Sequence, residues 1–268
     1  MLRPSTGAGR LIPRRSGDAV RTLRFPPAEV QIFPDIAALS SAGAAGFARA
    51  AREAVTVRGR FTVALAGGST PRGLYLQLAA NEQSGASRLP WDRIHVFFGD
   101  ERCVPPDHPE SNFRMASESL LARVPIPPAN VHRLRGEDDP ARAAAEAERD
   151  LREFFGTGRP KFDLVLLGLG TDGHTASLFP ETEALRESVR LVAANWVPKL
   201  NAHRLTLTLP VLNNAEEIGF LVTGAEKAKV LTEILRPSAS GFAHPASAVR
   251  PTCGRLLWLV DESAAAGL

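Results

Sequence analysis

Short, mostly apolar runs recur along the chain, and each is followed directly by a glycine. The runs cover residues 61–66, 93–98, 164–167 and 218–223. The run at 164–167 shows no polar alternation, which is typical of a central parallel strand covered on both faces. A glycine after a strand lets the backbone take positive φ and approach a ligand closely. The pattern therefore predicts buried strands that end where a ligand could bind.

Segments with helical spacing separate these runs. Helices are predicted at residues 35–58, after Thr70-Pro71, after Ser111-Asn112, at residues 138–155, after Ala225 and from Asp261 onward. Further strands are predicted at residues 130–134, 189–194, 204–209 and 256–260. The alternation in 204–209 is typical of a half-exposed or edge strand. Together the elements predict an α/β fold: an open, mostly parallel twisted sheet with helices on both faces, of Rossmann-like type.

Length and composition fit one large domain. The chain has 268 residues, of which 44% are hydrophobic and 23% charged, so it can bury a sizeable core. The regular pattern begins only after the first 25 residues, and no linker interrupts it later. We therefore expect residues 1–25 to be a disordered basic extension and residues 26–268 to form a single domain.

The positive charge is concentrated at the N-terminal end. The formal net charge is +3, but residues 1–25 contribute +5, which leaves −2 for residues 26–268. The arginines of this head are Arg3, Arg10, Arg14, Arg15, Arg21 and Arg24. Because the remaining body is not basic, we expect no nucleic-acid partner.

The sequence gives no sign of membrane insertion or secretion. No stretch approaches the roughly 18 consecutive apolar residues of a membrane span, and residues 1–25 lack the apolar segment of a secretory signal. Two cysteines, Cys103 and Cys253, make neither a disulfide framework nor a metal-ligand spacing. We expect a cytoplasmic protein, either a monomer or a weak homo-oligomer, with no membrane partner.

Two titratable side chains follow the buried run at 164–167. Asp172 and His174 stand one glycine apart in a turn that also contains Gly168, Gly170 and Gly173. In open α/β sheets, ligands bind outside the carboxyl ends of the strands. Three glycines and a neighbouring carboxylate favour a site over a simple turn. We expect Asp172 and His174 to carry out acid–base chemistry there.

The loops after the other runs carry groups that bind anions. Gly68, Ser69 and Thr70 stand at a predicted helix start, where backbone N–H groups and hydroxyls can hold an anion. Asp100 and Arg102 follow the run at 93–98, and Lys227 opens the helix after residue 224, where a cation is unfavourable unless it faces an anion. Because parallel strands end at one edge of the sheet, these loops should form one cleft that suits a phosphate monoester.

Other nucleotide and hydrolase motifs do not fit. The GLGTDG stretch at 168–173 would place Asp172 and His174 against a pyrophosphate, so it is a poor dinucleotide site. The chain contains no Walker-type phosphate loop and no G-x-S-x-G nucleophile elbow.

Five separated motifs carry a family resemblance. They are GGSTP at 67–71, GDERCVPPDHPESN at 99–112, LGLGTDGHTASLFP at 167–180, RLTLTLPVLNNA at 204–215 and VTGAEKAKVL at 222–231. In this order they resemble the 6-phosphogluconolactonases, which share a wider group with the glucosamine-6-phosphate deaminases. The resemblance runs from about residue 30 to 262. It implies the deaminase-type fold and makes residues 26–268 a catalytic domain that binds a sugar phosphate.

The resemblance also implies roles for individual residues. His174 would be the general base that takes a proton from the water attacking the lactone carbonyl, and Asp172 would orient it or hold that water. The phosphate would be held by Gly68, Ser69, Thr70, Arg102, Arg204 and Lys227, with Asp100 on the sugar side. The small-molecule partner would be 6-phosphogluconolactone. No metal and no cofactor are expected, because side chains can neutralise the phosphate and the ester is already activated.

Two alternatives are open. In the deaminase the corresponding turn resembles GHIAFNEP, whose glutamate helps to open the sugar ring. This chain has Phe179 at that place, which cannot relay a proton, although Glu181 lies two positions later. A non-catalytic sugar-phosphate sensing domain would keep the phosphate grip and lose the base, whereas this chain has both His174 and Asp172.

Overall fold

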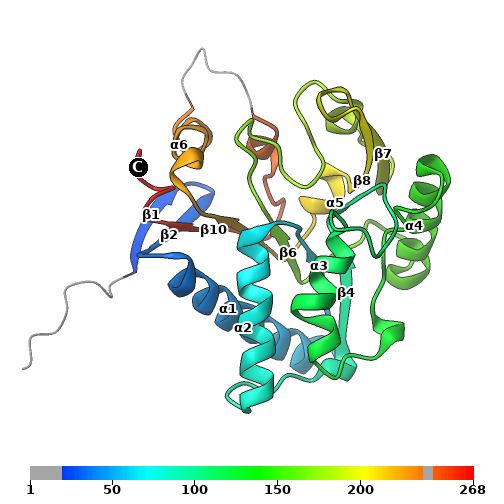
Figure 1. Ribbon diagram of the computed structural model, residues 1–268, viewed down its shortest axis with the longest axis horizontal. Coiled ribbons are helices and arrows are strands. Elements are labelled where there is room, and N and C mark those ends of the chain that lie inside the picture. The colour runs from blue at the N-terminus through cyan, green and yellow to red at the C-terminus, as the bar shows by residue number, and fades with distance from the viewer. Residues whose placement is uncertain (1–19, 238–243) are drawn as a thin grey trace, which may run out of the picture.

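A computed structural model describes residues 20–237 and 244–268 of the chain (Figure 1). It contains a seven-stranded sheet and a separate three-stranded sheet. The larger sheet consists, in spatial order, of β1 (Arg21–Phe25), β2 (Ala28–Phe33), β10 (Arg255–Asp261), β9 (Glu217–Val222), β6 (Leu164–Leu167), β3 (Phe61–Leu65) and β4 (Ile94–Phe98). All its neighbours pair in parallel except β1 and β2, which form an antiparallel hairpin. The predicted open, mostly parallel sheet is confirmed.

The smaller sheet is antiparallel. Its order is β5 (Asp100–Arg102), β8 (Ala202–Leu207) and β7 (Val192–Val197). The strand β5 follows β4 after one residue, Gly99, so the chain passes directly from the large sheet into the small one. The small sheet therefore begins at the carboxyl edge of the large one.

Helices connect many of these strands along the chain. The α-helices are α1 (Ile36–Arg58), α2 (Ser69–Ser84), α3 (Asn112–Ser119), α4 (Pro140–Phe155), α5 (Leu209–Leu212) and α6 (Ala228–Leu235). The short 3₁₀ helices are Trp91–Arg93, Leu121–Arg123, Pro128–Asn130, Glu183–Arg186, Pro198–Leu200, Ala225–Lys227 and Pro245–Ala248. Within the described ranges, no helix is long and apolar enough to cross a lipid bilayer.

Local sequence explains the longest helix, α1. Asp35 precedes it in extended conformation, and the Asp35 carboxylate accepts a hydrogen bond from Ala38 N at 2.8 Å, as a capping residue does. Gly59 ends the helix with φ +74°, a left-handed conformation that glycine adopts without strain. Its apolar stripe, which includes Leu39 and Phe47, is buried.

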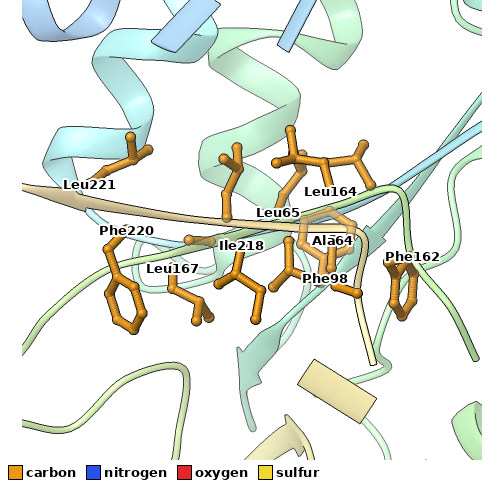
Figure 2. Packing of buried hydrophobic residues seen from close by; sticks show 14 of the residues in the cluster. Ala64, Leu65, Phe98, Phe162, Leu164, Leu167, Ile218, Phe220 and Leu221 are labelled. Carbon is orange, nitrogen blue, oxygen red and sulfur yellow. The ribbon is translucent and has the colours of Figure 1, made fainter. Parts of the chain in front are cut away.

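Both faces of the large sheet are covered. Leu164 and Leu221 point to one face, and Leu167, Ile218 and Phe220 point to the other (Figure 2). The first face contacts α1 and α2. On the other face, Phe97 of β4 packs against Phe154 and Phe155 of α4, with ring centroids 5.2 and 5.7 Å apart. Burial on both sides explains why the central strands are continuous apolar runs.

The strand order changes direction between β3 and β6. These two strands are neighbours, yet the chain continues from β3 to β4 on one side and from β6 to β9 on the other. The connections after β3 and β6 therefore separate and leave a crevice at the carboxyl ends of the strands, where α/β proteins bind ligands. The Gly-Ser-Thr loop and the Asp172–His174 turn are the two sides of that crevice.

Several predicted elements need correction. Residues 130–134 form no strand; Val131 makes only an isolated bridge to Val96, because the 3₁₀ helix Pro128–Asn130 precedes it. The chain after Asp261 forms turns instead of a helix. The Asp261 carboxylate accepts the Ala264 N–H at 2.8 Å and also the Gly224 N–H at 3.1 Å, which fixes a turn against the end of β9.

The N-terminal boundary and two strands also differ from expectation. Residues 21–25 form strand β1 and do not belong to a disordered extension. Residue 20 precedes the strand, and residues 1–19 of that predicted segment lie outside the described residues. The strand β2 was not predicted. The strands β7 and β8 are shifted from the predicted 189–194 and 204–209, and they belong to the small sheet.

Candidate active site

A cavity of about 410 Å³ opens at the carboxyl ends of β3, β4, β6 and β9. Its size falls in the range of about 300–1,000 Å³ that is common for small-molecule sites. The polar residues that line it are Ser69, Thr70, Asp100, Arg102, Asn112, His174, Thr175, Thr223, Glu226 and Lys227. The cleft predicted from the strand ends is therefore present at the switch in strand order.

The turn after β6 is held by its own backbone. Gly170 N donates to His174 O at 2.8 Å, and Gly173 N donates to Gly170 O at 3.0 Å. Gly173 has φ +77°, which favours glycine. A Cβ at Gly170 would lie 2.0 Å from His174 Nδ1 and 2.7 Å from an Asp172 carboxylate oxygen. Glycine is needed at 170 because the imidazole and the carboxylate pack directly on that backbone.

Asp172 lies behind His174 and bonds to its ring. The distance from His174 Nδ1 to Asp172 Oδ1 is 2.5 Å, and His174 N donates to the same oxygen at 3.2 Å. Lys199 Nζ donates to the other carboxylate oxygen at 2.9 Å. Burial opposes ionisation of Asp172, but the bonds from Lys199 and His174 outweigh it and hold the pKa of this carboxyl well below its usual range. Asp172 is therefore a carboxylate at neutral pH.

Phe179 packs on the face of the same imidazole. The ring centroids of His174 and Phe179 are 4.1 Å apart with an interplanar angle of 20°, a stacked arrangement. Phe179 is buried. The His174 ring is therefore fixed in its plane by Asp172 and on one face by Phe179, and it lines the cavity.

The opposite side of the cavity combines two glycine-led turns. Gly68 has φ +102° and leads into α2, so that Ser69 and Thr70 occupy the first helical turn. Thr70 Oγ1 lies 2.7 Å from Thr223 Oγ1 at the end of β9, which joins the two loops. Gly224 has φ +100° and leads into the segment that brings Lys227 to the cavity. Free N–H groups of a helix start, hydroxyls and an ammonium are a suitable set for an anion.

Two arginines lie side by side on neighbouring strands of the small sheet. Arg102 of β5 and Arg204 of β8 are direct partners in the antiparallel ladder. Burial, and then the positive charge of Arg102, lower the pKa of Arg204. Like charges directly opposite each other are unfavourable in a ladder. Arg102 lines the cavity, whereas Arg204 lies one strand farther back and is not among the residues that line it.

The carboxylate of Asp100 is held by hydrogen bonds from neighbouring side chains. It lines the cavity and is buried, but both carboxylate oxygens are occupied. Ser177 Oγ donates to Oδ2 at 2.7 Å and Asn112 Nδ2 donates to Oδ1 at 3.1 Å. Its neighbour Glu101 is also buried, and it accepts the Asn112 and Phe113 N–H groups at the start of α3. Asp100 thus forms part of the cavity wall, and Glu101 holds the start of α3, where Asn112 lines the cavity.

The structure thus brings most of the predicted site residues to one cavity. Gly68, Ser69, Thr70, Asp100, Arg102, His174 and Lys227 line it, and Asp172 and Arg204 stand directly behind lining residues. Sequence reasoning placed Asn112 only at the start of a predicted helix and gave Thr223 and Lys199 no role in the site. Their contacts are with residues 12 to 153 positions away in the chain, so no local pattern could reveal them. In the described ranges, no group of three or more His, Cys, Asp or Glu residues is placed to hold a metal ion.

Comparisons with known proteins agree with this geometry. Residues 34–258 match the family described as glucosamine-6-phosphate isomerases/6-phosphogluconolactonase. The 6-phosphogluconolactonase of Nostoc sp. is 44% identical over 243 residues, which cover 89% of this chain and 98% of that protein. The Synechocystis sp. 6-phosphogluconolactonase is 46% identical over 220 residues, 81% of this chain and 88% of that protein. A solved 6-phosphogluconolactonase from Thermotoga maritima matches with a TM-score of 0.75 at 32% identity, covering 88% of this chain and 100% of that one. The chain belongs to the glucosamine-6-phosphate isomerase/6-phosphogluconolactonase family.

Proposed function

We propose that this protein hydrolyses 6-phospho-D-glucono-1,5-lactone to 6-phosphogluconate, the lactonase step of the oxidative pentose phosphate pathway. The observation that carries the proposal is the place of His174: it lines a cavity whose other side holds hydroxyls, a helix start and cations, and its ring is bonded to an ionised carboxylate. A phosphorylated ring with one reactive carbonyl suits both halves of this cavity.

The bond to Asp172 fixes which nitrogen of His174 acts as the base. An ionised carboxylate can only accept hydrogen bonds, so Nδ1 must carry the proton in the 2.5 Å contact with Asp172 Oδ1. The lone pair is then on Nε2. Neutral imidazole with a free Nε2 is a suitable base near neutral pH. Asp172 therefore sets the tautomer and stabilises the imidazolium that forms during the reaction.

The chemical steps use this one base twice. His174 Nε2 takes a proton from water, and the water oxygen attacks the lactone carbonyl to form a tetrahedral intermediate. When the intermediate collapses, the bond between the carbonyl carbon and the ring oxygen breaks. The imidazolium returns its proton to that ring oxygen, which becomes the 5-hydroxyl group, and the new carboxylic acid loses a proton to solvent.

The phosphate is proposed to bind at the far side of the cavity. Gly68, Ser69 and Thr70 would offer N–H groups and hydroxyls, and Lys227 and Arg102 would offer charge. Arg204 would act from behind Arg102, because the two side chains share a ladder position and their mutual repulsion is relieved by an anion. Asp100 would shape the sugar side, with its carboxylate held by Ser177 and Asn112.

Two other functions, deamination and sugar-phosphate sensing, are alternatives to lactone hydrolysis within this fold. Glucosamine-6-phosphate deamination would need a proton relay near the base, and Phe179 supplies an apolar ring against His174. A sensing domain would need no base, yet His174 is held by Phe179 and by Asp172, which is itself bonded to Lys199. Lactone hydrolysis accounts for both features.

The proposal is tested by proton release. Freshly made 6-phosphogluconolactone is added to weakly buffered solution with and without the protein, because δ-lactones also hydrolyse unaided. We expect acid to form many times faster with protein than in buffer. A rate equal to the buffer rate contradicts lactonase activity, and ammonia released from glucosamine 6-phosphate would favour the deaminase.

We also propose that the enzyme works in the cytoplasm as a monomer or a weak homo-oligomer. Cys103 and Cys253 are free thiols, which accords with a reducing compartment. Light scattering across a range of protein concentrations measures the assembly, and a mass that stays at twice 28.7 kDa or more on dilution would contradict it.

A further inference from the structure

A segment far from the turn in sequence packs directly on the backbone of Gly173. A Cβ at Gly173 would lie 2.4 Å from His244 Nδ1 and 2.6 Å from two carbons of that side chain. Gly173 is the residue before the proposed base, His174. The His244 side chain therefore packs on Gly173 at the point where a side chain would otherwise stand.

The same segment also bonds to the turn. Ala246 N donates to Gly173 O at 2.9 Å, and Ser247 N donates to His244 O at 2.8 Å, which closes the 3₁₀ turn Pro245–Ala248. Gly173 O is the carbonyl of the peptide that leads into His174. One hydrogen bond to the Gly173 carbonyl and one side-chain contact at the Gly173 Cα thus act on the residue that precedes His174.

His244 is in turn connected to α6. His244 Nε2 lies 2.8 Å from Glu233 Oε2, and the His244 side chain is only 14% exposed. Glu233 stands on α6, the helix that begins at Ala228, immediately after Lys227 at the cavity. A continuous path of covalent structure and contacts therefore runs from Lys227 through α6, Glu233 and His244 to Gly173.

We propose that His244 is a positioning residue for catalysis: with Glu233 and Ala246 it forms a clip that fixes the Gly173–His174 peptide and so the direction of the imidazole. This inference rests on the proposed function only for its kinetic consequence. The clip does not touch the cavity, since neither His244 nor Glu233 is among its lining residues. Its loss should therefore reduce turnover and leave binding of the substrate in place.

The test compares three variants with the parent. His244→Ala removes the ring and its bond, Glu233→Ala removes only the partner of the ring, and His244→Gln keeps a donor toward Glu233. Misplacing a catalytic group by about 1 Å can cost about 100-fold in rate. We expect kcat of His244→Ala to fall roughly 10-fold or more with KM within about 2-fold, a smaller fall for Glu233→Ala, and partial recovery in His244→Gln. Glu262→Ala, which removes an exposed carboxylate elsewhere, is the control.

A second measurement separates this inference from the lactonase proposal. Deuterium uptake of peptides that contain residues 168–175 reports on the hydrogen bonds of the turn whether or not the protein is active. We expect faster uptake there in His244→Ala, unchanged uptake in peptides from α1, and parent-like uptake in Glu262→Ala. Parent-like uptake and parent-like kcat in His244→Ala would overturn the clip. Faster uptake with no lactonase activity in the parent would support the clip and contradict the proposed function instead.

Discussion

Ser177 donates a hydrogen bond from Oγ to Asp100 Oδ2 at 2.7 Å, although the two residues are 77 positions apart in the chain. Asp100 begins β5, just after β4, and Ser177 follows the Asp172–His174 turn after β6, so this bond joins two walls of the cavity. Both residues are buried. Removing either partner leaves the other buried group without a hydrogen bond, which costs folding free energy. We therefore expect the site to be sensitive to substitution of either residue.

Asp100→Ala should lower both stability and activity. It leaves the Ser177 hydroxyl without its acceptor and removes one of the two acceptors of Asn112 Nδ2, which keeps its bond to the backbone oxygen of residue 100 at 3.0 Å. A buried unsatisfied group costs about 1–3 kcal/mol. Ser177→Ala removes only one of these bonds and should have the smaller effect. Urea denaturation of both variants measures the free energy of unfolding. An Asp100→Ala protein with the parent's denaturation midpoint would show that this bond does not hold the two walls together.

Lys199→Met should slow the reaction and change the acid dependence of stability. Without the ammonium, the pKa of Asp172 rises toward its ordinary value, because the bond from Lys199 helps to keep it low against the effect of burial. The folded-state pKa of Asp172 lies below its unfolded-state pKa of about 3.9. The ionised carboxylate therefore stabilises the folded protein fully above that pH, and this contribution is lost as the pH falls below it. The difference in unfolding free energy between parent and variant should therefore be constant from pH 7 to pH 5 and shrink below about pH 4.

Urea denaturation at several pH values checks this prediction, and Lys229→Met, at an exposed position on α6, is the control. A difference that grows as the solution becomes more acidic would show that the sign is wrong. Lactonase kinetics of the same variants should show a fall in kcat for Lys199→Met only.

Phe179→Leu should reduce turnover by loosening the imidazole. The stacked ring at 4.1 Å restricts His174 on one face, while Asp172 restricts it only in the ring plane. We expect kcat to fall roughly 10-fold, since a small displacement of a catalytic group is expensive in rate. Phe179→Tyr keeps the ring and should stay near the parent. If the leucine and tyrosine variants had equal kcat, stacking would have no part in positioning the base.

His132→Phe should flatten the pH dependence of stability between about pH 6.5 and 4. Burial, and then the neighbouring His95, lower the pKa of His132 to about 4, below the ordinary value of about 6.5. Between these two pKa values His132 is protonated in the unfolded chain and neutral in the folded protein. The free energy of unfolding therefore falls as the pH drops through this window.

The substitution removes that titration and keeps an aromatic ring beside Phe97, whose centroid is 4.2 Å away. Thermal unfolding of the parent and of His132→Phe at pH 7.5 and pH 5 measures the difference. The parent should lose more stability than the variant on acidification, and equal losses would contradict the assignment.

The sequence predicts the centre of this protein better than its margins. The run at 164–167 is covered on both faces, so its apolar character indicates a central strand without knowledge of the neighbours. The strand β5 has the sequence Asp100-Glu101-Arg102 and was interpreted as a charged loop, because only its pairing with β8 makes it a strand. The hairpin of β1 and β2 is not evident from the sequence for a similar reason. Its turn, Pro26-Pro27, separates two short strands, and the arginines in and before β1 resemble a disordered basic segment.

The residues of the site also divide into those that local sequence indicates and those that only the tertiary structure reveals. Glycines, hydroxyls and titratable groups at strand ends are local signals, and they indicate His174, Asp172 and the Ser69-Thr70 pair directly. The contacts of Lys199 with Asp172 and of His244 with Gly173 depend on where distant segments return to the sheet edge. Such contacts require tertiary structure, because neither lysine nor histidine stands in a pattern that distinguishes it from a surface residue.

The most direct test of the central claim is the rate of 6-phosphogluconolactone hydrolysis by His174→Ala, with His203→Ala as the control at an exposed histidine. Removing a general base costs about 100- to 10,000-fold in rate. The account predicts a fall of that size in kcat for His174→Ala, with the His203→Ala rate unchanged. A folded His174→Ala protein that hydrolyses the lactone as fast as the parent would contradict it.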